Sequence, residues 1–309
     1  MKKVAWPKGK KFAVCLTHDV DELRKTYQYV TRSIRYLKNK DVRSLRNEFL
    51  SFLQKMRGKE PYWTFDEIMN LERRLNVRST FFFLNETGKV KILDRSTWRH
   101  LGRKYDITDK KVVELIRTLN DEGWEIGLHG SFYSYNNIKL LRKEKEKLEK
   151  VLGENVRGVR QHNLNLEIPT TWKIHEKLGF EYDTSLGYND RVDFGGGTCF
   201  PFHPSDGSKR LNLLEIPLAI EDIALFRYKD PWSVCVKMVE EVERKGGVLT
   251  LLWHHSVFNE LEFPGWAEMY EKIIKLCKER NAWIATAGEI ARWWKKQEDD
   301  YDHRIEDSK

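Results

Sequence analysis

Residues 12–21 read Phe-Ala-Val-Cys-Leu-Thr-His-Asp-Val-Asp, and the organisation of the whole chain can be worked out from this stretch. An apolar run of strand length ends abruptly in a hydroxyl, an imidazole and two carboxylates. In α/β proteins, ligands bind beyond the carboxyl ends of parallel strands, and Asp19 and Asp21, two positions apart, leave such a strand on the same face. One carboxylate could be a base and the other a metal ligand. Either could equally be the N-cap of a helix that starts near Glu22, and this stretch alone favours neither interpretation.

The composition is that of a folded globular protein. The 309 residues are 40% hydrophobic and 12% aromatic, which is ample for a packed core. The sequence has no signal peptide and no apolar run long enough to span a bilayer, so we expect a cytoplasmic protein. Its four cysteines contain no CxxC pair and are expected to be reduced core residues.

A short apolar strand followed by polar residues and an amphipathic helix recurs along the chain. Later strands are predicted at 79–84, 124–128, 156–159, 180–182, 213–217, 248–253 and 283–286. Helices are predicted between them, one beginning at a capping box formed by Thr64 and Glu67. Seven or eight such units without a linker predict a single distorted barrel of parallel strands over residues 1–297. An open doubly wound sheet is the alternative, and residues 298–309 are predicted to be an acidic frayed tail.

The segment 22–60, after the first strand, is strongly basic and is predicted to form two helices, with Asp41 starting the second. It contains eleven basic and four acidic residues. A solvated helical face is the commoner meaning of such a charge excess, while weak contact with an anionic membrane surface or with nucleic acid is the alternative. Because no stacking aromatics are interleaved with the basic residues, we expect no specific nucleic-acid binding.

Charged and imidazole side chains stand at or just beyond the ends of the predicted strands. If the strands are parallel, these side chains share one rim of the barrel. Imidazoles together with carboxylates match the ligand preferences of a zinc-class metal. The set is Asp19, Asp21, His129, Arg160, His162, Asp222, His254 and His255.

These residues resemble the polysaccharide deacetylases with NodB homology, carbohydrate esterase family 4, over roughly residues 11–294. The likeness is closest to a divergent branch that has His-Asp-Val-Asp in place of Thr-Phe-Asp-Asp-Gly. The resemblance implies a distorted barrel of about seven strand-helix units. It also implies an enzyme that uses a divalent metal, most commonly Zn²⁺, to remove acyl groups from N-acetylated sugars.

By the same resemblance, Asp19 is the catalytic base, and Asp21 and His129 are metal ligands. The sequence departs from the family at Tyr133, which stands where the second metal histidine is found. His162 follows Arg160 and Gln161 where the family has Arg-x-Pro-Tyr, and we expect it to serve as the missing ligand. Tyr133 then becomes a candidate substrate contact.

The remaining roles also follow from the resemblance. Arg160 matches the arginine that orients the base, Asp222 the acid that supports this arginine, and His254 the general acid. His255 is the alternative to His254, but adjacent strand residues face opposite sides, so only one of them enters the site. Two further residues, Asp183 and Trp253, are expected to contact the substrate.

The sequence therefore predicts a metal-dependent hydrolase that removes an acyl group from an N-acylated amino sugar or a related amide. Its cytoplasmic location points to the biosynthesis of a cell-surface glycan. The alternative is a barrel of the same fold that has lost catalysis and binds a glycan or a protein partner, as the tyrosine at position 133 suggests.

Overall fold

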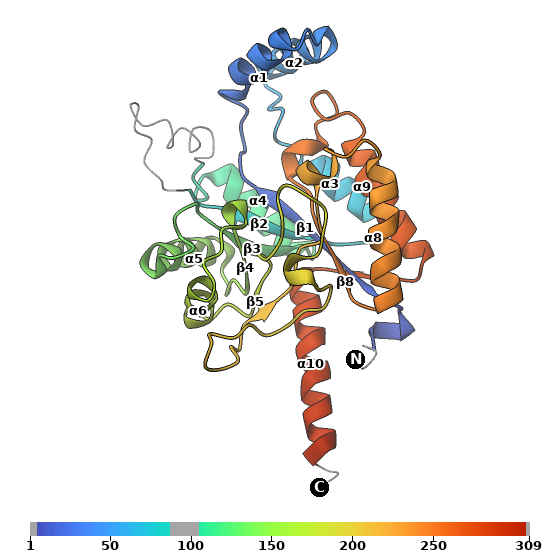
Figure 1. The fold of residues 1–309 in the computed structure, drawn as a ribbon. Coiled ribbons are helices and arrows are strands. Elements are labelled where there is room, and N and C mark those ends of the chain that lie inside the picture. The colour runs from blue at the N-terminus through green and yellow to red at the C-terminus, as the bar shows by residue number, and fades with distance from the viewer. Residues whose placement is uncertain (1–4, 87–104, 307–309) are drawn as a thin grey trace.

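The computed structural model describes residues 5–86 and 105–306, with side chains up to residue 298. Its centre is a curled nine-stranded sheet in the order β6-β5-β4-β3-β2-β1-β8-β7, with β9 paired to β1 and helices packed around it (Figure 1). All pairings between these strands are parallel. The two end strands, β6 and β7, are joined by residues 216–219 alone, so the sheet curls round into a distorted barrel. The predicted barrel, and not the open doubly wound sheet, is therefore the architecture.

The first strand is the centre of the sheet. All eight residues of β1 are buried, and β1 pairs with β8 over Ala13–Thr17, with β9 over Ala13–Cys15 and with β2 over Thr17–Val20. A strand covered on both faces needs a nearly continuous apolar run, which residues 12–16 supply. The strands are β1 Ala13–Val20, β2 Thr80–Leu84, β3 Glu125–Gly130, β4 Gly158–Gln161, β5 Tyr182–Asp183, β6 Leu214–Glu215, β7 Ile220–Glu221, β8 Val248–Leu252 and β9 Trp283–Ala285.

The helices lie between the strands, as the sequence predicts. Asp41 caps α2 by accepting a hydrogen bond from the backbone N–H of Ser44, and Gly153 ends α5 with a φ of 86°, a conformation that glycine adopts without strain. The helices are α1 Gln28–Lys38, α2 Val42–Met56, α3 Phe65–Arg74, α4 Lys110–Asp121, α5 Ile138–Leu152, α6 Thr170–Lys177, α7 Asp222–Leu225, α8 Pro231–Lys245, α9 Trp266–Glu279 and α10 Ala287–Glu306.

Three local predictions differ from the structure. Helix α3 does begin after Thr64, but the capping box is wrong: the Thr64 hydroxyl donates to the carbonyl of His255 at 2.5 Å and makes no cap. The two-residue strand β7 is not among the predicted strands. The last helix runs on to Glu306, through much of the segment predicted to be a frayed tail, and the side chains of that tail after residue 298 lie outside the described residues.

The basic segment forms a helical hairpin, which we define as residues 28–56, comprising α1, α2 and the turn between them. In Figure 1 it stands apart from the barrel, connected to it by two stretches of chain. One stretch comes from the carboxyl end of β1 and the other leads into α3. The hairpin therefore lies at the end of the barrel to which β1 delivers its polar residues.

Candidate metal and catalytic site

The predicted polar residues converge at the carboxyl end of the sheet. Asp19 is in β1, His129 in β3 and Arg160 in β4, while Asp21, His162 and His254 follow their strands directly. Because the strands are parallel and in register, His129 stands opposite Arg160 across the β3–β4 pair. Segments more than 200 residues apart in the sequence thus contribute to one site.

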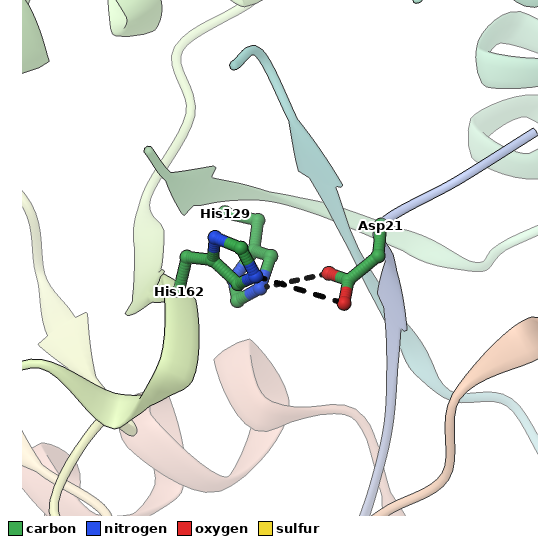
Figure 2. A group of neighbouring side chains, drawn as sticks. All are labelled: Asp21, His129 and His162. Carbon is green, nitrogen blue, oxygen red and sulfur yellow. Dashed lines mark ion pairs between the residues drawn. The ribbon is translucent and has the colours of Figure 1, made fainter. Parts of the chain in front are cut away.

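Asp21, His129 and His162 form the centre of this site (Figure 2). The Nε2 atom of His129 lies 3.2 Å from Asp21 Oδ1, and the Nε2 atom of His162 lies 3.8 Å from Asp21 Oδ2. The two imidazole rings are 5.3 Å apart, centre to centre. One potential ligand atom from each residue lies within 4.8 Å of the other two. The residue that sequence reasoning put in place of the family's second histidine therefore reaches the cluster.

The donor atoms of this cluster fit a divalent cation. His129 Nδ1 is 2.9 Å from the carbonyl oxygen of Arg160, and because a carbonyl only accepts, Nδ1 carries a proton and Nε2 is the ring nitrogen left to face the cluster. Nε2 faces a carboxylate oxygen, Asp21 Oδ1; both atoms are buried, and neither makes a hydrogen bond. Without a metal, Asp19 and Asp21 outweigh burial and raise the pKa of His129, and a divalent cation between Nε2 and Oδ1 would take the place of the added proton. Ligand atoms around a tetrahedral Zn²⁺ are about 3.4 Å apart, close to the observed distances.

Arg160 holds Asp19 beside this cluster. Its Nη1 atom donates to Asp19 Oδ1 at 2.9 Å and to the hydroxyl of Thr17 at 2.7 Å. Its Nε and Nη2 atoms donate to the carbonyl and hydroxyl of Thr184. Because the buried guanidinium donates hydrogen bonds to Thr184 on one edge and to Thr17 and Asp19 on the other, its position is fixed. It therefore also fixes the carboxylate of Asp19.

Both carboxylates are held in the ionised form. Burial on its own raises the pKa of Asp19, but His129 and Arg160 outweigh it, so that the pKa is lowered. Burial likewise opposes ionisation of Asp21, and the neighbouring His162 and His129 hold its pKa well below the usual value. An ionised Asp19 can accept a proton, and an ionised Asp21 can bind a cation.

Asp222 contacts a different partner from the predicted one. Its carboxylate does not support Arg160; Oδ1 lies 2.9 Å from Nδ1 of His254. Burial lowers the pKa of His254, but Asp222 and Asp21 outweigh burial and raise it well above its ordinary value. Because Asp222 follows β7 and His254 follows the adjacent strand β8, the two side chains meet at the rim. Asp222 thus sets the orientation of the His254 ring and favours its protonated form.

His254, and not His255, turns its ring toward Asp21. His254 turns Nε2 toward Asp21 Oδ2, 4.0 Å away, and its side chain is 14% exposed. His255 is buried, stacks on Phe65 at 5.0 Å, and points its two ring nitrogens at the backbone carbonyls of Asp19 and Glu22. His255 thus contacts the backbone on either side of Asp21.

Two of the three predicted substrate contacts are wrong. Asp183 and Trp253 have no exposed surface. The carboxylate of Asp183 accepts from the backbone and hydroxyl of Ser185 and faces His175, while Trp253 packs on Tyr270 in the core. The third residue, Tyr133, is 45% exposed and can still be reached by a ligand.

Sequence reasoning missed three residues that shape the site. Thr17 and Thr184 hold Arg160, and both stand at predicted strand ends, which was the available signal. The third, Tyr105, donates from its hydroxyl to the carbonyl of Val20 at 2.8 Å. Tyr105 also lines a cavity of about 410 Å³. The other residues of its wall include Leu23, which is two positions after Asp21 in the sequence, and Arg24, Trp63, Asp106 and Lys111.

Comparisons with known proteins identify the fold. No protein-family model matches the sequence, and no curated protein matches it. Among solved structures, a protein from Mycobacterium smegmatis provisionally described as a polysaccharide deacetylase is similar with a TM-score of 0.62 and 20% identity, over 96% of this chain and 95% of that one. A corresponding protein from Pseudomonas aeruginosa gives a TM-score of 0.62 at 14% identity, over 96% and 95% of the two chains. The allantoinase PuuE gives 0.61 at 14% identity, over 95% and 93%. The chain therefore has the fold of the polysaccharide deacetylases, as its resemblance to them implied.

Proposed function

We propose that this protein is a metal-dependent hydrolase that removes an acyl group from an N-acylated amino sugar or a related amide. One observation carries the proposal: His129 Nε2 and a carboxylate oxygen of Asp21 face each other 3.2 Å apart, buried and without hydrogen bonds. His162 completes a set of two imidazoles and one carboxylate, which is typical of catalytic zinc sites.

The residues around the cluster suit hydrolysis of an amide. A divalent cation bound by Asp21, His129 and His162 would supply a Lewis acid that polarises a carbonyl group and acidifies water. Asp19, ionised and held by Arg160, takes the proton from the attacking water molecule. His254 gives a proton to the leaving amine, and Asp222 keeps its ring in the orientation for this transfer.

The substrate class rests on fold similarity and on the adjoining cavity. Two of the similar structures are described as polysaccharide deacetylases and one as an allantoinase. The cavity beside Asp21 combines aromatic rings, Trp63 and Tyr105, with polar side chains such as Arg24 and Asp106. Sugar rings are commonly bound by such mixtures of aromatic and hydrogen-bonding groups. By its reaction, such an enzyme would serve the synthesis of a cell-surface glycan.

The test combines elemental analysis with an assay for acetate release. The wild-type protein, purified without a histidine tag, is compared with Asp21→Ala, His129→Ala and His162→Ala. The matched control is His203→Ala, which removes an imidazole that bonds the carbonyl of Leu211 outside the site. We expect about one equivalent of zinc or a similar metal in the wild type and the control, and its loss from all three site variants.

Activity is then measured on N-acetylated amino sugars, with allantoin as a second amide. Acetate release that depends on the metal supports the deacetylase. A wild type without metal even after reconstitution would contradict the proposal. A protein that binds metal but hydrolyses no amide would instead indicate the non-catalytic barrel, for which Tyr133, at the family's histidine position, is the motivating observation.

A further inference from the structure

The helical hairpin exposes an unusual number of large apolar side chains. Of the twelve large hydrophobic residues that are exposed in the described part of the chain, seven belong to the hairpin. They are Val30 (62% exposed), Ile34 (48%), Leu37 (61%), Val42 (76%), Phe49 (61%), Phe52 (44%) and Met56 (71%). Such a concentration on one element marks an interaction surface.

These side chains form an apolar stripe on each of the two helices, with Val30, Ile34 and Leu37 at helical spacing on α1. On α2, Val42, Phe49 and Met56 are spaced seven residues apart, so they lie in one stripe along the helix. An apolar groove of about 690 Å³ joins this stripe to α1 through Tyr29 and Ser33. We call the seven exposed residues together with this groove the apolar face of the hairpin.

The hairpin also has a large excess of positive charge. Seven cationic side chains in and directly after the hairpin form no ion pair with any described residue: Arg35, Lys38, Lys40, Arg43, Arg46, Arg57 and Lys59. Of the acidic groups of the hairpin, Glu48 is paired with Lys25, and Asp41 is used as the cap of α2. The exposed surface is therefore both apolar and strongly cationic.

The hairpin is fixed to the barrel through a buried charge cluster. Lys25, fully buried, contacts Glu48 of α2 at 2.7 Å and also pairs with Glu262, which in turn pairs with Arg32 of α1. Glu262 lies in the segment between β8 and α9. Because both helices are tied to the barrel in this way, the apolar face is presented in a defined direction.

We propose that the helical hairpin docks the protein on the surface of an anionic lipid membrane. The apolar face would enter the boundary between headgroups and acyl chains, and the cationic side chains of the hairpin would contact lipid phosphates. No helix of the described chain is long and apolar enough to cross a membrane. A second copy of the chain is a poorer occupant, because two hairpins with the same excess of positive charge repel each other. Nucleic acid would leave the aliphatic side chains without a partner.

Docking in this way would hold the candidate site close to the lipid headgroups. The hairpin begins seven residues after Asp21, at the same end of the barrel. The inference stands on the hairpin alone and does not depend on the proposed function, since vesicle binding is measured without any substrate.

The test is sedimentation with vesicles of phosphatidylcholine alone or mixed with phosphatidylglycerol, at low and at high salt. Three proteins are compared with the wild type: Arg35→Gln/Arg43→Gln/Arg46→Gln, Phe49→Ser/Met56→Ser, and the control Lys139→Gln/Arg142→Gln/Lys143→Gln. The control removes three exposed cations from α5, on another face of the barrel.

We expect the wild type to bind the mixed vesicles and not the neutral ones. Each cation near an anionic surface raises the partition coefficient by about a factor of five. The partition coefficient of the first variant should therefore be about 100-fold lower than that of the wild type at low salt. The second variant should lose on the order of tenfold for each apolar side chain, while the control should bind within about fivefold of the wild type. Circular dichroism identifies any variant that fails to fold.

Two results would overturn the inference. One is an absence of binding to the mixed vesicles, or binding that neither hairpin variant weakens. The other is a concentration-dependent dimer that Phe49→Ser/Met56→Ser dissociates, because the apolar face would then be covered by a second copy.

Discussion

His254 and Asp222 are joined by two hydrogen bonds. Asp222 Oδ1 lies 2.9 Å from His254 Nδ1, and Asp222 Oδ2 accepts a 2.6 Å hydrogen bond from the backbone N–H of the same residue. The carboxylate is fully buried, so no water competes for these bonds. The contact fixes both the backbone and the ring of His254, and it turns Nε2 toward Asp21.

Replacing Asp222 by asparagine should therefore reduce catalysis without removing the metal. An amide has one acceptor oxygen and cannot accept from both N–H groups of His254. We expect kcat to fall about 100-fold, with KM and metal content close to wild type. The control is Glu221→Gln, because this neighbour makes no hydrogen bond to the ring. Loss of metal from Asp222→Asn would contradict the assignment, since the metal would then lie in the second carboxylate-imidazole cluster, Glu221, Asp222 and His254.

Much of the barrel could be predicted because its central strands are buried on both faces. Continuous apolar runs such as residues 12–16 and 248–252 are typical of strands that are covered on both sides. Strand β7 contains only Ile220 and Glu221, which is too short to show any periodicity. The hydroxyl of Thr64 could not be assigned either, because its partner, the carbonyl of His255, is 191 residues away in the sequence.

Site residues could be predicted where a rule of local geometry or a family pattern applied. They could not be predicted where exposure of the side chain depends on the packing of distant segments. Alternation along a strand separates His254 from His255, and the same rule applied to Trp253 would have turned it away from His254 and into the core. Whether Asp183 is exposed depends on how closely α6 and its His175 pack over β5. Proximity of His162 to His129 follows from the pairing of β3 with β4, which the spacing of these residues in the sequence does not reveal.

Glu72 is expected to be a major determinant of stability. Its carboxylate is fully buried and accepts from Trp124 Nε1 at 2.6 Å, Tyr270 Oη at 2.7 Å and Ser79 Oγ at 3.0 Å, and it faces His18 Nε2 at 3.0 Å. A glutamine would turn an N–H₂ group toward these donors. We expect Glu72→Gln to lower the free energy of unfolding by roughly 3 kcal/mol in urea titrations.

The control for this change is Glu67→Gln, an exposed position on the same helix, which should stay within about 0.5 kcal/mol of wild type. Equal stabilities of the two variants would show that the buried network around Glu72 contributes little.

Glu144 should make stability depend on pH. Its side chain is buried against Ser131, whose hydroxyl and backbone N–H both donate to it, and burial raises its pKa from 4.5 to about 7. The folded state then binds the proton more tightly than the unfolded state, so stability is lost as the pH rises from about 4.5 to about 7.

Glu144→Gln keeps the size of the side chain and does not titrate. Over this pH range the free energy of unfolding of the wild type should fall by about 3 kcal/mol relative to that of the variant. Urea unfolding of both proteins at several pH values measures the difference. A constant difference would mean that Glu144 keeps an ordinary pKa in the folded protein.

Lys25 is expected to hold the hairpin on the barrel without supporting the barrel itself. Its ammonium group is fully buried between Glu48 and Glu262. In Lys25→Met, Glu262 keeps Arg32 as a partner, but Glu48 is left buried with an unpaired charge. Such a loss typically costs about 3–5 kcal/mol. Amide hydrogen exchange should accelerate on the order of 100-fold in α1 and α2, while β1 and β8 keep their protection.

The double variant Lys25→Met/Glu48→Met separates lost charge pairing from lost packing. Because it replaces the buried ion pair by two apolar side chains of similar size, the slow exchange of α1 and α2 should largely return. If both variants lose protection evenly over hairpin and barrel, the hairpin is part of the cooperative core and Lys25 does not act locally. If exchange changes in neither, the ion pair contributes nothing measurable, and the apolar contacts between α1 and α2 alone must keep the hairpin ordered.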